Sequence, residues 1–166
     1  MTAETVELQV GAPAPPFRAT TTDGEVTQAT YQGRQHLVLY FMRTFDCPVC
    51  LSHVMRLART SPQLQARHTT VLILGPGDIY EAEALRRKLP FPVAADPDLH
   101  IYQTFGLGQS LGIQQSGTAL IDRAGMLRYL NRSALPFGAL KEPALLAAIG
   151  EAEAALDSPE VQQRSS

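Results

Sequence analysis

The stretch that decides the fold runs from Leu37 to Cys50 and reads LVLYFMRTFDCPVC. Its first residues, 37–42, form an apolar run, which is typical of a strand buried on both faces of a sheet. We expect a helix to begin at about Pro48, because proline suits a first helical turn and apolar residues then recur at helical spacing. The stretch therefore predicts a buried strand followed by a helix, with Cys47 at their junction.

Further buried strands and helices alternate on either side of this stretch. Proline and glycine mark the turns between them, and Asp78 is placed to cap a helix. The expected elements are a strand pair that begins at Phe17 and turns at Asp23-Gly24, strands at 70–74, 93–95, 118–121 and 126–130, and later helices at 79–89, 97–105 and 139–156. This alternation predicts an α/β fold, with a mixed central sheet flanked by helices on both faces and an N-terminal β-hairpin.

The length and composition fit one globular domain. The chain has 166 residues, of which 45% are hydrophobic, and this suffices for one sizeable core. We expect this domain to span residues 1–156 and to be followed by a polar C-terminal tail at 157–166. The formal net charge of -2 gives no basic excess, so we expect neither a nucleic acid nor an anionic membrane as partner.

The sequence favours a cytoplasmic location. Residues 1–6 are polar and acidic, without the basic start and apolar stretch of a signal peptide. The apolar run 37–42 is far shorter than the roughly 20 residues that span a bilayer. In a reducing compartment, a Cys-x-x-Cys pair is more often redox-active or metal-binding than a permanent disulfide.

Cys47 and Cys50 are the two cysteines of the chain and the best candidates for its chemistry. Unpaired backbone N–H groups and the helix dipole stabilise a thiolate at a helix N-terminus, which lowers its pKa. Residues three apart on a helix lie about 60° from alignment, so the two sulfurs can bridge without unwinding the helix. We therefore expect Cys47 to be an exposed nucleophile at the helix tip and Cys50, one turn inside, to resolve it.

Two other interpretations of the pair are structural rather than redox-based. Cys50 can be a core residue with Cys47 as its inert neighbour, since cysteines are often buried. A zinc site would need two further ligands, and the nearest histidines, His53 and His68, do not give a usual finger spacing. We therefore expect no metal. The remaining histidines are expected at the surface or in loops: His36 and His100.

No cofactor site is predicted either. Gly75-Pro-Gly77 follows a strand and precedes a helix, as a phosphate-binding loop does. It lacks the further glycine and the Gly-Lys-Ser/Thr sequence of such a loop, so we interpret it as a turn.

Residues just before the cysteines bear on their ionisation. Thr44 lies three residues before Cys47, and its hydroxyl can donate to a thiolate or a peroxide oxygen, or else cap the helix. The carboxylate of Asp46 opposes ionisation of the neighbouring thiol. Arg43 offsets that effect if its side chain points back toward the site.

Several segments, taken in order, resemble the peroxiredoxin (AhpC/TSA) branch of the thioredoxin-fold superfamily. The similarity spans about residues 6–149, nearly the whole domain. The resemblance implies a thioredoxin-like fold, with Cys47 as the peroxidatic cysteine and Thr44 as the hydroxyl residue of the motif. The matching segments are 10–17 (VGAPAPPF), Asp23-Gly24, Gly33, 38–41 (VLYF), Thr44-x-x-Cys47, 95–98 (ADPD), Phe105-Gly106, 120–122 (LID), Gly125 and Leu127-Arg128.

The chain departs from this family pattern near the cysteines. Tyr40 stands where the family has a proline that shields the cysteine, and Ser116 stands where it has an activating arginine. Arg43 and Arg128 are the candidates to replace that arginine. The second cysteine, Cys50, follows the first more closely than is usual in peroxiredoxins. Such spacing is ordinary for thioredoxin-like oxidoreductases, yet those usually carry a tryptophan, and this chain has none.

Three functions are compatible with these residues. By resemblance we expect a thiol peroxidase for hydrogen peroxide or organic hydroperoxides, in which Cys47 becomes a sulfenic acid and Cys50 condenses with it into an intramolecular disulfide. An external thioredoxin- or glutaredoxin-like dithiol would reduce that disulfide, and the protein would be a monomer or homodimer. The alternatives are a thioredoxin-like thiol-disulfide oxidoreductase using the same CxxC and a non-enzymatic redox sensor.

Overall fold

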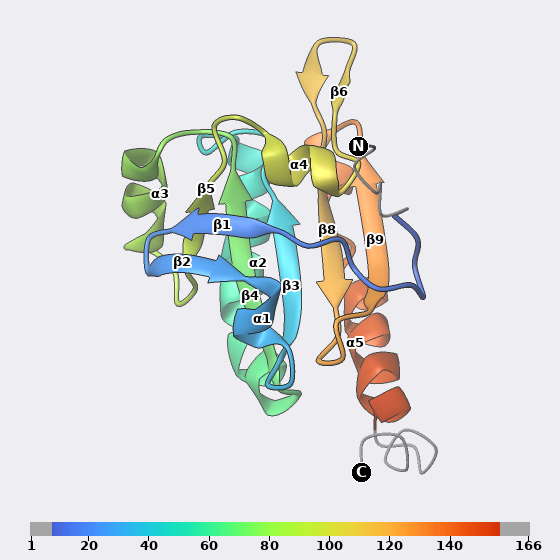
Figure 1. The fold of residues 1–166 in the computed structure, drawn as a ribbon. Coiled ribbons are helices and arrows are strands. Elements are labelled where there is room, and N and C mark those ends of the chain that lie inside the picture. Colours follow the sequence, from blue (N-terminus) through green and yellow to red (C-terminus); the bar gives the residue numbers. More distant parts are fainter. Residues whose placement is uncertain (1–7, 157–166) are drawn as a thin grey trace.

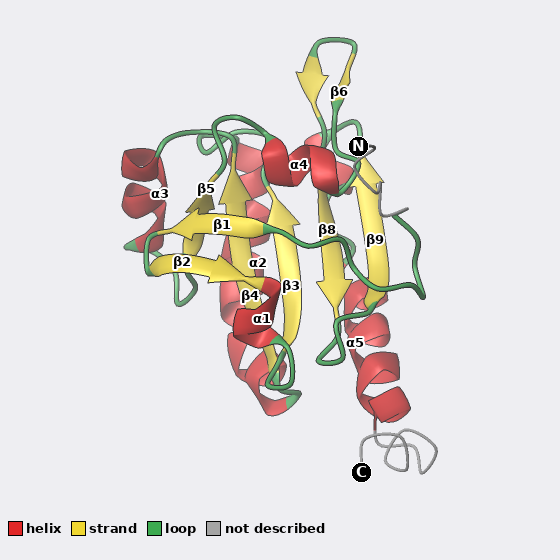
Figure 2. Ribbon diagram, in the orientation of Figure 1, coloured by secondary structure: helices red, strands yellow, loops and turns green. Residues whose placement is uncertain are grey.

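A computed structural model describes residues 8–156 of the chain. A mixed seven-stranded sheet forms its centre, in the order β2-β1-β5-β4-β3-β8-β9, and helices cover both faces (Figure 1). The small hairpin β6-β7 projects beyond one end of the sheet (Figure 2). The strands are β1 Arg18–Thr21, β2 Gly24–Thr27, β3 His36–Phe41, β4 Thr69–Gly75, β5 Val93–Ala95, β6 Gln109–Ser110, β7 Ile113–Gln114, β8 Ser116–Ile121 and β9 Leu127–Ser133. The helices are α1 Gln28–Tyr31, α2 Pro48–Ala66, α3 Ile79–Arg86, α4 His100–Thr104, α5 Glu142–Leu156 and the 3-10 helix η1 Pro136–Gly138.

The central strand β3 pairs with a neighbour on each side. It runs parallel to β4, with His36 opposite Thr69, and antiparallel to β8, with Phe41 opposite Gly117. The parallel pairs β3-β4 and β4-β5 are joined through α2 and α3, because parallel strands need a crossover connection. The β1-β2 hairpin extends the sheet through β5. The predicted α/β fold, with its mixed sheet and N-terminal hairpin, is confirmed.

The core consists of two apolar clusters, one on each face of the sheet, and β3 contributes side chains to both. Every residue of β3 is buried, and successive side chains point to opposite faces. Val38 and Tyr40 belong to the apolar cluster that contains side chains of α2, α3 and α5. Leu39 and Phe41 belong to a second cluster that contains side chains of α4. The continuous apolar run 37–42 thus has the structural cause that its pattern predicted.

Some element boundaries differ from those expected. Helix α3 ends at Arg86, and α4 begins at His100 rather than at 97, because the carboxylate of Asp96 accepts the backbone N–H groups of residues 100–102. Helix α5 begins at Glu142, after the 3-10 turn η1. Helix α1 and the β6-β7 hairpin were not predicted, since elements this short show no periodicity.

Across residues 8–156, no helix has both the length and the apolar character needed to cross a membrane. The N-terminal residues 1–6 and the tail 157–166, on which two of the expectations rest, lie outside the described residues.

His36 is buried rather than at the surface, so that expectation is wrong. Its Nε2 lies 2.6 Å from Glu153 Oε1 on α5, and the backbone N–H of Arg123 donates to its Nδ1 at 3.1 Å. The ring therefore joins β3 to α5 and to the turn after β8. Burial lowers the pKa of His36 and outweighs the opposing effect of Glu153. His100 is exposed, as expected.

Stability is expected to fall as the pH drops from 7 to 5. The pKa values of His36 and His53 lie below the unfolded value of about 6.5, so the unfolded chain binds more protons in this window. Each kcal/mol lost corresponds to about 2–4 °C in the thermal midpoint. Thermal unfolding at several pH values measures the slope.

His36→Gln should flatten this slope, because one of the two contributing groups is gone. His68→Gln is the matched control, since His68 is exposed and only 3.7 Å from the same Glu153 carboxylate. Equal slopes for His36→Gln and the wild type between pH 5 and 7 would contradict the assignment.

Candidate active site

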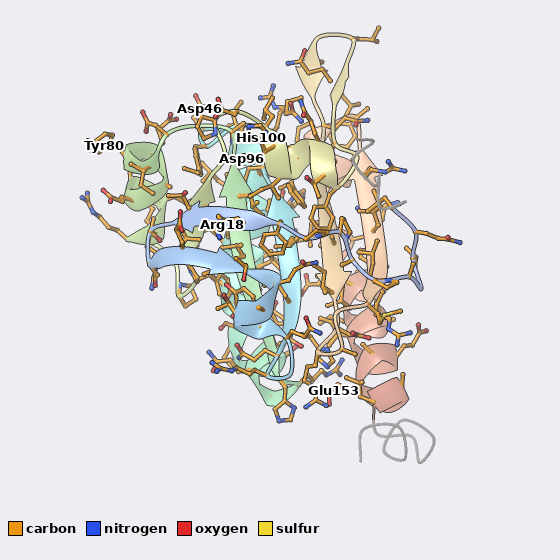
Figure 3. The ribbon with its side chains drawn as sticks, viewed as in Figure 1. Arg18, Asp46, Tyr80, Asp96, His100 and Glu153 are labelled. Atoms are coloured by element: carbon orange, nitrogen blue, oxygen red, sulfur yellow. The ribbon has the colours of Figure 1, made fainter. Side chains whose placement is uncertain are left out.

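The cysteine pair lies where β3 gives way to α2. Cys47 is the N-cap of α2, Pro48 occupies its first turn, and the backbone N–H of Cys50 donates to Cys47 Sγ at 3.4 Å. Asp46, labelled in Figure 3, marks the end of the sheet at which this junction lies. An N–H donor and the positive end of a 19-residue helix both favour the thiolate form of Cys47. The predicted strand-to-helix placement is confirmed.

Both thiols are free and buried, which corrects the expectation of an exposed Cys47. Only 2% of Cys47 and 0% of Cys50 is exposed. The two residues belong to the same apolar cluster as Phe45 and Tyr40, whereas Asp46 and Pro48 on either side of Cys47 are exposed.

Arg43 is the cation that reaches Cys47. Burial raises the pKa of Cys47, but hydrogen bonds from Cys50 and from the Arg43 guanidinium, together with the Arg43 charge, outweigh it. The pKa of Cys47 therefore lies below its ordinary value. The Nε of Arg43 is buried, and no group in the described part of the chain pairs with it. The guanidinium retains a donor for a further acceptor beside the sulfur.

Cys50 is shifted in the opposite direction. Burial raises its pKa to about 11, helped by the hydrogen bond with Cys47, while the Arg43 backbone N–H, 3.4 Å from Cys50 Sγ, opposes the rise. At neutral pH the site therefore favours a thiolate at Cys47 and a thiol at Cys50. The two thiols are separated electrostatically although they are three residues apart.

Thr44 lies in the loop before Cys47, and its hydroxyl is engaged by Asp46. The Thr44 hydroxyl donates to Asp46 Oδ1 at 2.7 Å, and this hydrogen bond lowers the pKa of the Asp46 carboxyl. The backbone carbonyl of Thr44 accepts the N–H of Cys47 at 3.3 Å. Neither the Thr44 nor the Asp46 side chain caps α2, because Cys47 itself is the N-cap.

Arg128 does not belong to the site, so its candidacy is wrong. Its Nε donates to the buried Asp122 carboxylate at 2.6 Å. It follows Leu127, which pairs with Ile121, and Ile121 pairs with Leu37 at the start of β3. That end of the strand is opposite to the end that leads to Cys47.

Tyr40 and His53 are site residues that sequence reasoning missed. Tyr40 Oη lies 2.8 Å from His53 Nδ1, and Tyr40 also acts on the ionisation of Cys50, in the same buried cluster. The signal was present in the sequence: Tyr40 alternates in phase with Val38, and a buried tyrosine hydroxyl needs a partner. By its spacing, His53 is a poor zinc ligand, and that interpretation does not reveal its contact with Tyr40. Within residues 8–156, no group of three or more His, Cys, Asp or Glu side chains is placed to hold a metal ion.

Gly75 leaves room for the loop that carries the cysteines. It ends β4, and a Cβ at this position would collide with the ring of Phe45. Phe45 is itself buried in the cluster of Cys47. The segment 75–77 is thus a turn, as expected, and Asp78 caps α3 by accepting the N–H of Glu81 at 2.9 Å. The absence of a side chain at Gly75 helps to position Cys47.

The sequence matches the AhpC/TSA family over residues 10–130. The chain belongs to the AhpC/TSA family. Among similar proteins, alkyl hydroperoxide reductase E of Mycobacterium tuberculosis is 27% identical over 128 residues, which cover 74% of this chain and 84% of that protein. Peroxiredoxin tpx1 of Schizosaccharomyces pombe is 25% identical over 154 residues, which cover 84% of this chain and 80% of that protein.

A solved structure with the same fold is that of reduced Plasmodium vivax 2-Cys peroxiredoxin. The two structures superpose with a TM-score of 0.77 and 20% sequence identity. The superposition covers 90% of this chain and 99% of the Plasmodium vivax chain. The thioredoxin-like fold implied by the resemblance is therefore confirmed. As a peroxiredoxin, the protein is a peroxidase-type oxidoreductase, in agreement with the expected enzyme class.

Arg43→Gln should raise the pKa of Cys47 in this peroxiredoxin, because the guanidinium that stabilises the thiolate is lost. Alkylation of Cys47 by iodoacetamide at pH 7 should slow several-fold, as measured by peptide mass spectrometry across pH. Arg128→Gln is the matched control and should leave the pH profile of Cys47 unchanged. A shift of the same size in both variants would show that Arg43 does not act locally.

Gly75→Ala should destabilise the fold by about 1–3 kcal/mol, the usual cost of overpacking a core. The added methyl group must displace Phe45 and with it the loop before Cys47. Gly108→Ala is the control, since nothing lies within 4 Å of a Cβ at that position. Denaturant unfolding measures the difference, and equal midpoints for the two variants would contradict it.

Proposed function

We propose that this peroxiredoxin reduces hydrogen peroxide or organic hydroperoxides through Cys47 and closes each turnover with a Cys47–Cys50 disulfide. The observation that carries the proposal is the placement of the two thiols: Cys47 caps α2 and accepts the Cys50 N–H at 3.4 Å, while Cys50 is fully buried one turn inside. Arg43 and the helix N-terminus favour thiolate at Cys47, while burial keeps Cys50 protonated. An enzyme that uses one sulfur as nucleophile and its neighbour as resolving thiol needs this difference.

In the first step, the Cys47 thiolate attacks the distal oxygen of the peroxide. An S–O bond forms, the O–O bond breaks, and the departing oxygen takes a proton to become water or an alcohol. Cys47 is oxidised to a sulfenic acid, and the peroxide is reduced. The unpaired Nε of Arg43 supports stabilisation of the oxygen that gains charge. We assign Thr44 a second donor role, in which its hydroxyl turns from Asp46 to the peroxide.

In the second step, Cys50 attacks the sulfenic sulfur. An S–S bond forms, the S–O bond breaks, Cys50 gives up its proton, and the departing hydroxide is protonated to water. The hydrogen bond from the Cys50 N–H to Cys47 Sγ already holds the two residues together. A thioredoxin- or glutaredoxin-like dithiol then reduces the disulfide, which suits a reducing compartment such as the cytoplasm. A monomer or homodimer would suffice, because both cysteines come from one chain.

Cys47→Ser should abolish peroxide consumption, because serine offers no thiolate. Cys50→Ser should complete one turnover and then accumulate sulfenic or over-oxidised Cys47, because no second thiol closes the cycle. Peroxide consumption and intact mass measure these outcomes. Each single variant keeps one of the chain's two cysteines, so oxygen that peptide mass spectrometry locates on cysteine has one possible site. Peroxide consumption by Cys47→Ser at the wild-type rate would exclude the proposal.

The second candidate is thiol-disulfide exchange by the same pair. It is favoured by the raised pKa of Cys50, which suits a buried second thiol, and by Tyr40 at the family's proline position. Stopped-flow mixing of the reduced protein with hydrogen peroxide and with glutathione disulfide separates the two functions. Reaction with peroxide no faster than that of a free thiol, together with rapid exchange, would select the second candidate.

A further inference from the structure

We infer that Tyr40 and His53 form a proton relay for Cys50. Tyr40 is a catalytic residue that exchanges a proton with the Cys50 sulfur, and His53 is a positioning residue that acts through Tyr40. The inference rests on the proposed function, because it concerns the steps in which Cys50 forms and breaks the disulfide. Neither residue lies in the segment from Cys47 to Cys50.

The three side chains meet between β3 and α2. Tyr40 Oη is 2.8 Å from His53 Nδ1, and the two rings lie edge to face with centroids 5.9 Å apart. Cys50 and His53 lie one helical turn apart on α2, and both are buried. Tyr40 and Cys50 are buried in the same apolar cluster, and the thiol and the tyrosine hydroxyl act on each other's ionisation. The Tyr40 hydroxyl therefore links the Cys50 thiol to the His53 imidazole.

Burial makes such a relay necessary. Tyr40 and Cys50 are 0% exposed and His53 is 6% exposed, so bulk water does not lie beside the Cys50 sulfur. A thiol with a pKa of about 11 carries very little thiolate at neutral pH. Its attack is fast only if a base removes the proton as the S–S bond forms, and a general base typically contributes 10²–10⁴-fold.

In the forward direction, the Cys50 thiol gives its proton to Tyr40 Oη while Tyr40 passes its own to His53 Nδ1. The Cys50 sulfur bonds to the Cys47 sulfur, and the S–O bond of the sulfenic acid breaks. The leaving hydroxide takes a proton from solvent, and the His53 imidazolium returns its proton to solvent, so the net products are the disulfide and one water. Burial raises the pKa of Tyr40 far above its usual value, so Tyr40 transfers the proton in concert and does not hold a charge.

In the reverse direction, a thiolate of the external dithiol attacks Cys47 and Cys50 leaves. A leaving thiolate with a raised pKa is poor unless it is protonated as the S–S bond breaks. Tyr40 supplies that proton and recovers one from His53. The disulfide is reduced to two thiols, and the external dithiol is oxidised.

The charged and titratable groups around the relay keep His53 neutral at pH 7. Burial lowers its pKa, and the Arg56 charge lowers it further, although Arg56 also lies 3.8 Å from Glu142 on α5. The other titratable groups that act on Tyr40 are Cys47, Cys50 and Tyr102. A neutral imidazole with a free Nδ1 lone pair is the form that accepts a proton.

The test compares Tyr40→Phe and His53→Asn with the wild type. Asparagine keeps a hydrogen-bonding atom near the position of Nδ1 but accepts no proton in the neutral range. The matched controls are Tyr129→Phe, a hydroxyl beside the same core cluster, and His36→Gln, a buried histidine at the far end of β3. Quenched-flow mixing with hydrogen peroxide, followed by alkylation and intact mass, separates sulfenic acid formation from disulfide formation.

The relay predicts that both variants form the sulfenic acid within about twofold of the wild-type rate and close the disulfide about 10²-fold more slowly. Wild-type closure should be independent of pH above about 6.5, where His53 is neutral, whereas closure in His53→Asn should rise about tenfold per pH unit with Cys50 ionisation. Wild-type closure rates in both variants, or slower closure with an unchanged pH profile, would overturn the relay. If Tyr40→Phe does not fold, His53→Asn decides alone.

A second measurement keeps this inference separate from the peroxidase. The disulfide is made with diamide rather than peroxide, and its reduction by dithiothreitol is followed in the same variants. Slower reduction in Tyr40→Phe and His53→Asn, with unchanged controls, supports the relay even if the wild type fails to reduce peroxide. Equal reduction rates in all five proteins would overturn it even if peroxide reduction is confirmed.

Discussion

Burial of β3 on both faces is the constraint on which the rest of the structure depends. All six of its residues are buried, so the strand must have hydrogen-bonded neighbours on each side and a covering layer on each face. β4 and β8 supply the neighbours, and α2 with α5 supplies one of the layers. Because α2 must return across the face that Tyr40 occupies, its first turn is placed directly beyond the end of the strand. The cysteine pair is held at this point.

The same burial sets the chemistry of the pair. Removing a thiol from water raises its pKa, and both cysteines bear this cost. Cys47 receives the helix N-terminus, the Cys50 N–H and the Arg43 guanidinium, which more than offset it. Cys50 receives mainly the backbone N–H of Arg43, which does not. Two identical side chains one turn apart thus acquire opposite ionisation preferences, because charges and dipoles act strongly where water is excluded.

The sequence was most informative where a local pattern has one structural cause. The apolar run 37–42, Pro48 and the spacing of the cysteines predicted the strand, the helix and the junction, because pleat, pitch and capping are local properties. The burial of Cys47 was not predictable in this way, since its loop is packed through contacts between residues distant in the sequence, such as Phe45 against Gly75. The sequence alone does not distinguish Arg43 from Arg128 as the arginine beside Cys47. Only the register of β3, β8 and β9 shows that one lies at the site and the other at the opposite end of the sheet.

The departures from the family pattern are connected rather than independent. Ser116 stands where the resemblance places an activating arginine, and its buried hydroxyl has no hydrogen-bond partner in the described part of the chain. Arg43, which lies in the loop of Cys47, lowers the pKa of Cys47 and needs no distant strand to bring it near. Tyr40 stands where the pattern has proline, and it faces Cys50, the thiol whose placement is also unusual. Under the proposed mechanism, a resolving cysteine in the core lies close to Cys47 but has no access to water, and a hydroxyl on the facing strand gives its proton a route that proline would lack. Cys50 and Tyr40 are therefore physically complementary. The buried thiol needs a partner for its proton, and the buried tyrosine hydroxyl needs a polar partner.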